Sequence, residues 1–266
     1  MKNNPIGIFD SGIGGLTVAN AIIEHLPEEQ IIYFGDTKHL PYGDKSPEAI
    51  MEYSRKITEY LIYEKKCKAI VIACNTASSI SYNILRDRFK GAYPIISVID
   101  PIIEAIVLNN EIKKVGLIAT KATVNSGVYQ EKLYRRKPEL VFAALATPLL
   151  VPMIEEGFYD NNISHSLIEN YLNQPELNSI DALILGCTHY YIIKNEINSF
   201  YNSKIKLFDS TKIVAQKLRK ILEKEQLLND NKTAEHQFLV SDYTHSFAQT
   251  AKIFYKGKLE LQKVNI

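Results

Sequence analysis

Short apolar runs alternate with longer amphipathic segments along most of this chain. Five runs are rich in Ile, Val and Leu: residues 6–9, 31–34, 69–73, 115–119 and 182–185. Continuous apolar runs of this length are typical of parallel strands that are buried on both faces. Between them, residues 47–64 and 124–136 carry charge on one side and apolar residues at helical spacing. The pattern predicts an α/β fold in which helices connect the strands of a mostly parallel sheet.

The chain also repeats itself, which changes one expected sheet into two. Three pairs of segments align: 6–11 with 115–120, 68–76 with 181–189, and 97–100 with 206–209. The second pair are strands that end in Cys74 and Cys187, and the spacing is similar, because Gly7 precedes Cys74 by 67 residues and Gly116 precedes Cys187 by 71. We therefore expect two pseudo-symmetric domains, each a mostly parallel sheet flanked by helices, with four strands in register.

The repeat sets the expected domain limits. Residues 237–240 form a ninth strand, followed by a helix to about Tyr255, and have no counterpart in the second copy, so we expect them to return to the first sheet. The first domain is then discontinuous, residues 1–97 with 210–266, and the second comprises residues 98–209. Ligands of open parallel sheets bind beyond the carboxyl ends of the strands. We place the active site in the cleft between the domains.

Composition and charge narrow the class of protein. The chain has 266 residues, 46% of them hydrophobic, and its 31 basic residues balance 30 acidic ones, so nothing in it favours nucleic acid. Residues 141–154 form the longest apolar stretch, which is interrupted by two prolines and too short to span a bilayer. Residues 2–10 leave no room for the apolar core of a signal peptide. We expect a cytoplasmic protein that does not bind membranes.

The three cysteines are the first candidates for chemistry. Their odd number and the lack of C-x-x-C spacing argue against disulfides and a zinc site, so no metal is expected. Cys67 is interpreted as a core residue. Cys74 and Cys187 each end a strand, and a helix N-terminus facing them would favour thiolate. Inverting a stereocentre needs a base on one face of the carbon and an acid on the other, which two matched thiols supply. A cysteine protease would leave one of them unexplained.

Other motifs remain open between a structural and a functional interpretation. The cluster from Asp10 to Gly15 is a tight strand-to-helix turn or a cradle in which Asp10 and Ser11 hold an ammonium group; it lacks the last glycine of a dinucleotide fingerprint. Asp36 is a helix cap, a loop anchor or a proton relay. His189 stands two residues after Cys187 and is placed to tune that thiol. Residues 41–43 form a turn that closes over a ligand.

These motifs resemble those of glutamate racemases, in the cofactor-independent aspartate/glutamate racemase superfamily. The resemblance spans nearly the whole chain and rests on residues 9–15, 35–37, 41–43, 73–78, 151–157 and 186–190. It implies direct interconversion of L- and D-glutamate without a cofactor, supply of D-glutamate for peptidoglycan synthesis, and a homodimer. It also implies that Cys74 takes the proton from D-glutamate and Cys187 from L-glutamate.

The resemblance assigns further site residues. The catalytic set becomes Cys74, Cys187, Asp10, His189, Asp36 and Glu155, with Asp10 assisting Cys74 and His189 assisting Cys187. The implied substrate contacts are Asp10, Ser11, Tyr42, Gly43, Asn75, Thr76, Thr120, Thr188 and His189. Two other functions stay open: a racemase for aspartate or another amino acid, whose pocket differs by about a methylene, worth about 1–3 kcal/mol, and a non-catalytic dicarboxylate-binding protein, which would not need paired cysteines.

Overall fold

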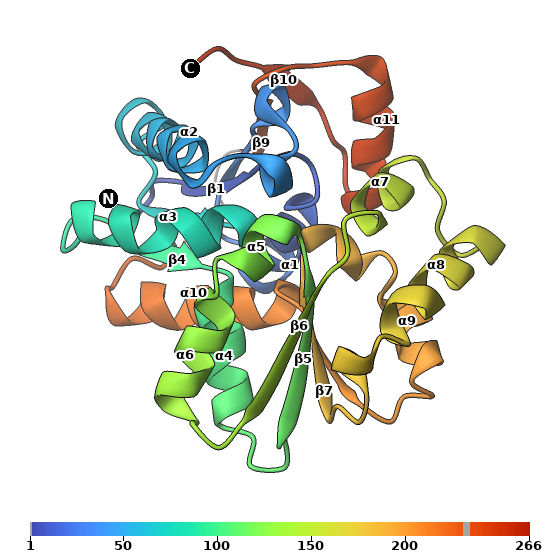
Figure 1. Ribbon diagram of the computed structural model, residues 1–266. Coiled ribbons are helices and arrows are strands. Elements are labelled where there is room, and N and C mark those ends of the chain that lie inside the picture. The colour runs from blue at the N-terminus through green and yellow to red at the C-terminus, as the bar shows by residue number, and fades with distance from the viewer. Residues whose placement is uncertain (1, 231–234) are drawn as a thin grey trace.

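The computed structural model describes residues 2–230 and 235–266 and contains two parallel sheets flanked by helices (Figure 1). The larger sheet has the strand order β10-β9-β2-β1-β3-β4 and the smaller one β6-β5-β7-β8. The strands are β1 (Ile6–Asp10), β2 (Ile31–Gly35), β3 (Ala69–Ile72), β4 (Ile95–Ser97), β5 (Lys114–Ala119), β6 (Val141–Ala146), β7 (Ala182–Gly186), β8 (Lys206–Phe208), β9 (Gln237–Val240) and β10 (Leu261–Lys263). The α/β class with two parallel sheets is confirmed.

Helices connect successive strands, as the amphipathic segments predict. They are α1 (Leu16–His25), α2 (Pro47–Glu59), α3 (Asn75–Arg88), α4 (Ile99–Val107), α5 (Lys121–Asn125), α6 (Val128–Arg136), α7 (Leu150–Glu155), α8 (Asn162–Leu172), α9 (Lys194–Phe200), α10 (Thr211–Lys224) and α11 (His245–Phe254). The expected single helix over 124–136 is instead two, because Gly127 adopts a left-handed φ of 65° between α5 and α6. Among the described residues, no helix is long and apolar enough to span a membrane.

The internal repeat is visible in the strand register. In the larger sheet Gly7 lies opposite Ile70, and in the smaller sheet Gly116 lies opposite Leu183, as the alignment of 6–11 with 115–120 and of 68–76 with 181–189 requires. The expected alignment of the third pair of segments was wrong. Ile95 pairs with Ile70 and Leu207 pairs with Leu183, so β4 and β8 align three residues away from the proposed match of 97–100 with 206–209.

The C-terminal part of the chain returns to the larger sheet. Strand β9 pairs with β2, which confirms the expectation for residues 237–240, and β10 then adds an edge strand that the sequence did not indicate. All strands of the larger sheet thus come from residues 6–97 and 237–263, and all strands of the smaller one from residues 114–208. The exact domain limits stay a prediction.

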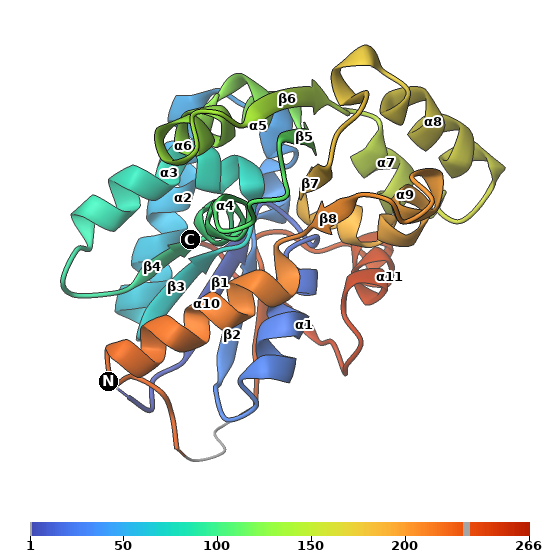
Figure 2. The same cartoon turned by 90° about the horizontal axis from the view of Figure 1, so that it is seen from below.

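The core continues from one sheet to the other. Alternate residues of β1 face opposite sides, so that Ile8 packs under α1 and α10 while Phe9 packs under α2 and α3. The first of these clusters also includes Leu117 of β5 and Ile102 of α4. Seen from below, α10 and α4 lie at the junction between the two sheets (Figure 2). The lobes therefore share buried apolar contacts as well as a cleft.

A buried ion pair stands at the start of β3. The side chains of Lys68 and Glu29 are 0% and 1% exposed, and Lys68 Nζ lies 2.5 Å from Glu29 Oε2. Lys68 Nζ also donates to the carbonyl of Lys2, and Glu29 Oε1 accepts from the backbone N–H of Asn229. The pair joins four segments at the end of the sheet opposite to the strand ends that carry the candidate chemistry.

Candidate active site

The candidate residues gather where the carboxyl ends of the two sheets meet. Asp10 is the last residue of β1, Cys74 follows β3 at the N-cap of α3, Thr120 follows β5 at the N-cap of α5, and Cys187 follows β7. In Figure 1 the strands β5 and β7 of the smaller sheet run to the middle of the molecule, where α5 lies beside α3. The fold therefore brings the two copies of the repeated motif face to face.

A cavity of about 250 Å³ lies between them, and both thiols line it. Eight of the nine expected substrate contacts also line it: Ser11, Tyr42, Gly43, Asn75, Thr76, Thr120, Thr188 and His189. Pro41, from the turn expected to close over a ligand, lines it too. Sequence reasoning missed several other wall residues, namely Leu40, Asp44, Lys121, Thr147, Pro148, Val151, Pro152 and Gly186. The signal for Thr147 was available, because it follows β6 in the same way as Thr120 follows β5. In the described part of the chain, no cluster of His, Cys, Asp and Glu forms a metal site.

Cys74 lies in a covered position at the start of a helix. Its Sγ accepts the backbone N–H of Ala77 at 3.4 Å and donates to Ser11 Oγ at 3.5 Å, and the residue is 6% exposed. The expectation that a helix N-terminus faces this thiol is confirmed. Burial, aided by the negative charge of Asp10, nevertheless raises the thiol pKa to about 12. Cys74 is thus a protonated thiol at neutral pH, ready to act as an acid.

Cys187 has a different neighbourhood, built around an imidazole. Its Sγ lies 3.7 Å from His189 Nδ1, and His189 Nε2 lies 2.9 Å from Glu155 Oε1. Burial lowers the pKa of His189, but the hydrogen bonds with Cys187 and Glu155 outweigh it and raise the pKa to about 10. At neutral pH the ring is therefore an imidazolium, and its Nδ1–H donates to the Cys187 sulfur. The proximity of His189 to Cys187 agrees with the assisting role expected for it.

We expect the protonation of His189 to be measurable directly. The folded-state pKa of about 10 exceeds the ordinary 6.5, so the stability that the charged ring contributes is fully present below pH 6.5 and is lost as pH rises through 10. NMR of 13C-labelled histidines should show one imidazole titrating near pH 10, and at a lower pH in Glu155→Gln, which lacks the carboxylate. If no imidazole of the parent protein titrates near pH 10, this account is contradicted.

Asp10 lies behind the cavity wall and not on it. Its Oδ2 accepts the backbone N–H of Gly12 at 3.0 Å, its side chain is buried, and burial raises its pKa. It is therefore the one expected substrate contact that does not line the cavity, although its charge acts on Cys74. The glycine cluster lets the turn after β1 come close to the other lobe, since a Cβ on Gly14 would lie 2.4 Å from both Thr188 Oγ1 and His189 Nδ1. Only glycine lets this turn touch the opposite lobe.

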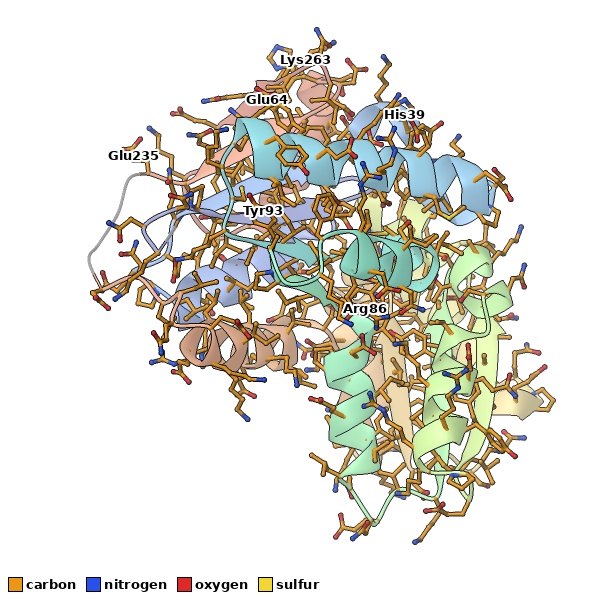
Figure 3. All side chains as sticks on the ribbon, turned by 90° about the vertical axis from the view of Figure 1, so that its left-hand side faces the viewer. His39, Glu64, Arg86, Tyr93, Glu235 and Lys263 are labelled. Carbon is orange, nitrogen blue, oxygen red and sulfur yellow. The ribbon has the colours of Figure 1, made fainter. Side chains whose placement is uncertain are left out.

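Asp36 fastens the loop that carries Tyr42. Tyr42 Oη donates to Asp36 Oδ2 at 2.7 Å, Ser241 Oγ donates to Oδ1 at 2.8 Å, and His39 Nδ1 lies 2.9 Å from the same carboxylate. The His39 ring stacks on the ring of Tyr53 in α2. Figure 3 shows His39 beside this helix. Asp36 does not line the cavity, and these contacts agree with the loop-anchor interpretation. Its role as a supporting acid stays a prediction.

Two like α/β lobes with a thiol from each in a shared cavity define an isomerase of the racemase type. The comparisons with known proteins agree. The model of the Asp/Glu/Hydantoin racemase family matches residues 14–218. The glutamate racemase of Geobacter metallireducens is 38% identical over 255 residues, which cover 96% of this chain and 93% of that protein. The chain belongs to the Asp/Glu/Hydantoin racemase family, and the expectation of that family is confirmed.

Solved structures give the same result. The glutamate racemase of Francisella tularensis, crystallised in complex with D-glutamate, is 37% identical, with a TM-score of 0.92 over 100% of this chain and 98% of that one. The aspartate racemase of Picrophilus torridus is 22% identical, with a TM-score of 0.59 over 85% of this chain and 99% of that one, and it shares the fold alone. The likeness is thus much stronger to glutamate racemases.

Proposed function

We propose that this protein interconverts L-glutamate and D-glutamate by direct proton transfer between two cysteines. The observation that carries the proposal is that Cys74 and Cys187, from the two copies of one motif, line the same cavity. The choice of glutamate is supported by the relatives of nearly full length, which are glutamate racemases, and by the relative solved with D-glutamate.

The proposed reaction from L-glutamate begins at Cys187. Its thiolate, held by the His189 imidazolium, removes the proton from Cα, and the electron pair of that C–H bond stays on the substrate as a carbanion. Cys74, protonated because burial raises its pKa, then donates its proton to the opposite face and forms the new C–H bond. D-glutamate reacts in reverse, with Cys74 as the base and Cys187 as the acid. Cys187 gains one proton and Cys74 loses one, so after one turnover the protonation states of the two thiols are exchanged.

The weak acidity of an α-proton requires the site to stabilise the carbanion. Hydroxyl groups surround the cavity: Thr76 Oγ1 of one lobe lies 2.9 Å from Thr120 Oγ1 of the other, and Ser11 and Thr188 line the wall. These groups bind the substrate carboxylates, while Asp36 positions Tyr42 and Gly43 over them. The domains, residues 1–97 with 210–266 and residues 98–209, close around the substrate and exclude water. The proposal includes a cytoplasmic homodimer that supplies D-glutamate for peptidoglycan synthesis.

Proton NMR in deuterated water tests the proposal. Incubation with L-glutamate and, separately, with D-glutamate should replace the α-proton by deuterium. Circular dichroism should show that each enantiomer loses its optical activity without an added cofactor. Exchange of aspartate but not glutamate would move the substrate to the shorter dicarboxylate. A protein that binds glutamate yet leaves its α-proton in place would overturn the catalytic proposal in favour of a binding protein.

A further inference from the structure

A buried tyrosine from the second lobe touches a cavity residue of the first. Tyr129 of α6 donates a hydrogen bond from its Oη to Oδ1 of Asn75, the first residue of α3, at 2.7 Å. The two residues are 1% and 2% exposed. Asn75 lines the cavity, whereas Tyr129 stands behind it. Among the described residues, the Asn75 Nδ2 amide group has no hydrogen-bond partner.

We infer that Tyr129 is a positioning residue that orients the Asn75 amide so that its N–H groups face the substrate carboxylate. The inference rests on the proposed function, since it assigns a partner to the orphaned amide nitrogen. A buried polar nitrogen without a partner is costly, and a carboxylate in the adjoining cavity is the acceptor that suits it.

The direction of the hydrogen bond follows from the chemistry of the phenol. Burial, together with the negative charges of Asp100 and Cys187, raises the pKa of Tyr129 well above its ordinary value, so the hydroxyl keeps its proton. A hydroxyl with one acceptor in reach donates to it, and the acceptor on an amide is the oxygen. The amide therefore cannot turn over without setting its nitrogen against the donor and its oxygen against the substrate carboxylate.

The contact also joins the two lobes. Asn75 follows Cys74 directly on the larger sheet, while Tyr129 stands on α6, which packs against α4 and α5 beside the smaller sheet. The orientation of the carboxylate donor therefore depends on the second lobe being in place. The Asn75 amide thus presents its N–H groups to the substrate only when the two lobes are in contact.

The test is a double-mutant cycle on substrate affinity. Tyr129→Phe removes the hydroxyl and keeps the ring, and we expect it to raise KM for both enantiomers by about 10-fold with kcat changed less than about 3-fold, because the lost orientation weakens a hydrogen bond to a charged group. In an Asn75→Ala background the same change should leave KM unaltered, because there is no amide to orient. Circular dichroism checks the fold of each variant.

Tyr134→Phe is the matched control, since Tyr134 lies on the same helix with a side chain 69% exposed, and its KM should equal that of the parent. Asn75→Asp offers a second measurement: it sets a carboxylate against the substrate carboxylate and should raise KM more than Asn75→Ala does. Three results would overturn this inference but not the proposed function. They are a smaller rise of KM in Asn75→Asp than in Asn75→Ala, additive effects of the two substitutions on KM, and an unchanged KM in Tyr129→Phe. A parent protein inactive on both enantiomers of glutamate would instead overturn the proposed function and the inference with it.

Discussion

Replacing either Cys74 or Cys187 by Ala is expected to reduce racemisation by about 100-fold to 10,000-fold, the range that a positioned acid or base contributes. Each variant removes the proposed proton carrier on one face of Cα, and no other thiol lines the cavity in the described part of the chain. The loss is measured as the rate of optical inversion, starting from each enantiomer. Full turnover in either variant would sink the two-thiol mechanism.

Cys67 supplies the matched control for this experiment. It is fully buried and lies away from the cavity, beside Gly7 in the core of the larger sheet, and burial raises its thiol pKa to about 12. Cys67→Ala should therefore keep the racemisation rate of the parent. A loss in all three alanine variants would point to a general response of the fold to cysteine replacement.

Replacing Lys68 by Met is expected to lower the free energy of unfolding by about 3–5 kcal/mol, because it leaves the Glu29 carboxylate buried without its cation. The two side chains are 0% and 1% exposed, so water does not reach the carboxylate in the folded protein. Urea unfolding followed by circular dichroism measures the change. The double replacement Lys68→Met with Glu29→Met should recover much of the loss, since the uncompensated charge is then gone.

Lys217→Met is the comparison for this prediction. Lys217 pairs with Glu104 at 2.8 Å, but these side chains are 33% and 43% exposed, and an exposed pair contributes at most about 1 kcal/mol. Equal losses of stability in Lys68→Met and Lys217→Met would contradict the account of the buried pair.

The sequence predicts the fold where a segment carries a strong local pattern. The strands that end at Cys74 and Cys187 are apolar throughout and align with each other, and the structure gives them the same register against β1 and β5. Strands β4 and β8 are only three residues long, too short to carry a pattern, and their alignment was accordingly wrong by three residues. Strand β10 is exposed in part and depends on the neighbouring β9 for its identity as a strand.

The sequence predicts most of the residues that gather around the cavity but not how their side chains are oriented. The sequence places Asp10 at the end of a strand, but only the structure shows that its carboxylate accepts Gly12 N–H and leaves the cavity wall to its neighbours. The bond between Tyr129 and Asn75 joins residues 54 positions apart, and no motif marks it. Contacts of this kind arise from the packing of one lobe on the other, which a linear pattern does not encode.

The unequal covering of the two cavity thiols also determines how the site meets electrophiles. Cys187 keeps part of its surface open and has an imidazolium beside its sulfur, whereas Cys74 is 6% exposed and hydrogen-bonded at a helix end. An alkylating compound that enters the cavity therefore reaches Cys187 first. A covalent inhibitor for this protein is best built with its reactive group directed to the wall of the smaller sheet, where one modification removes one of the two thiols that the proposed reaction needs.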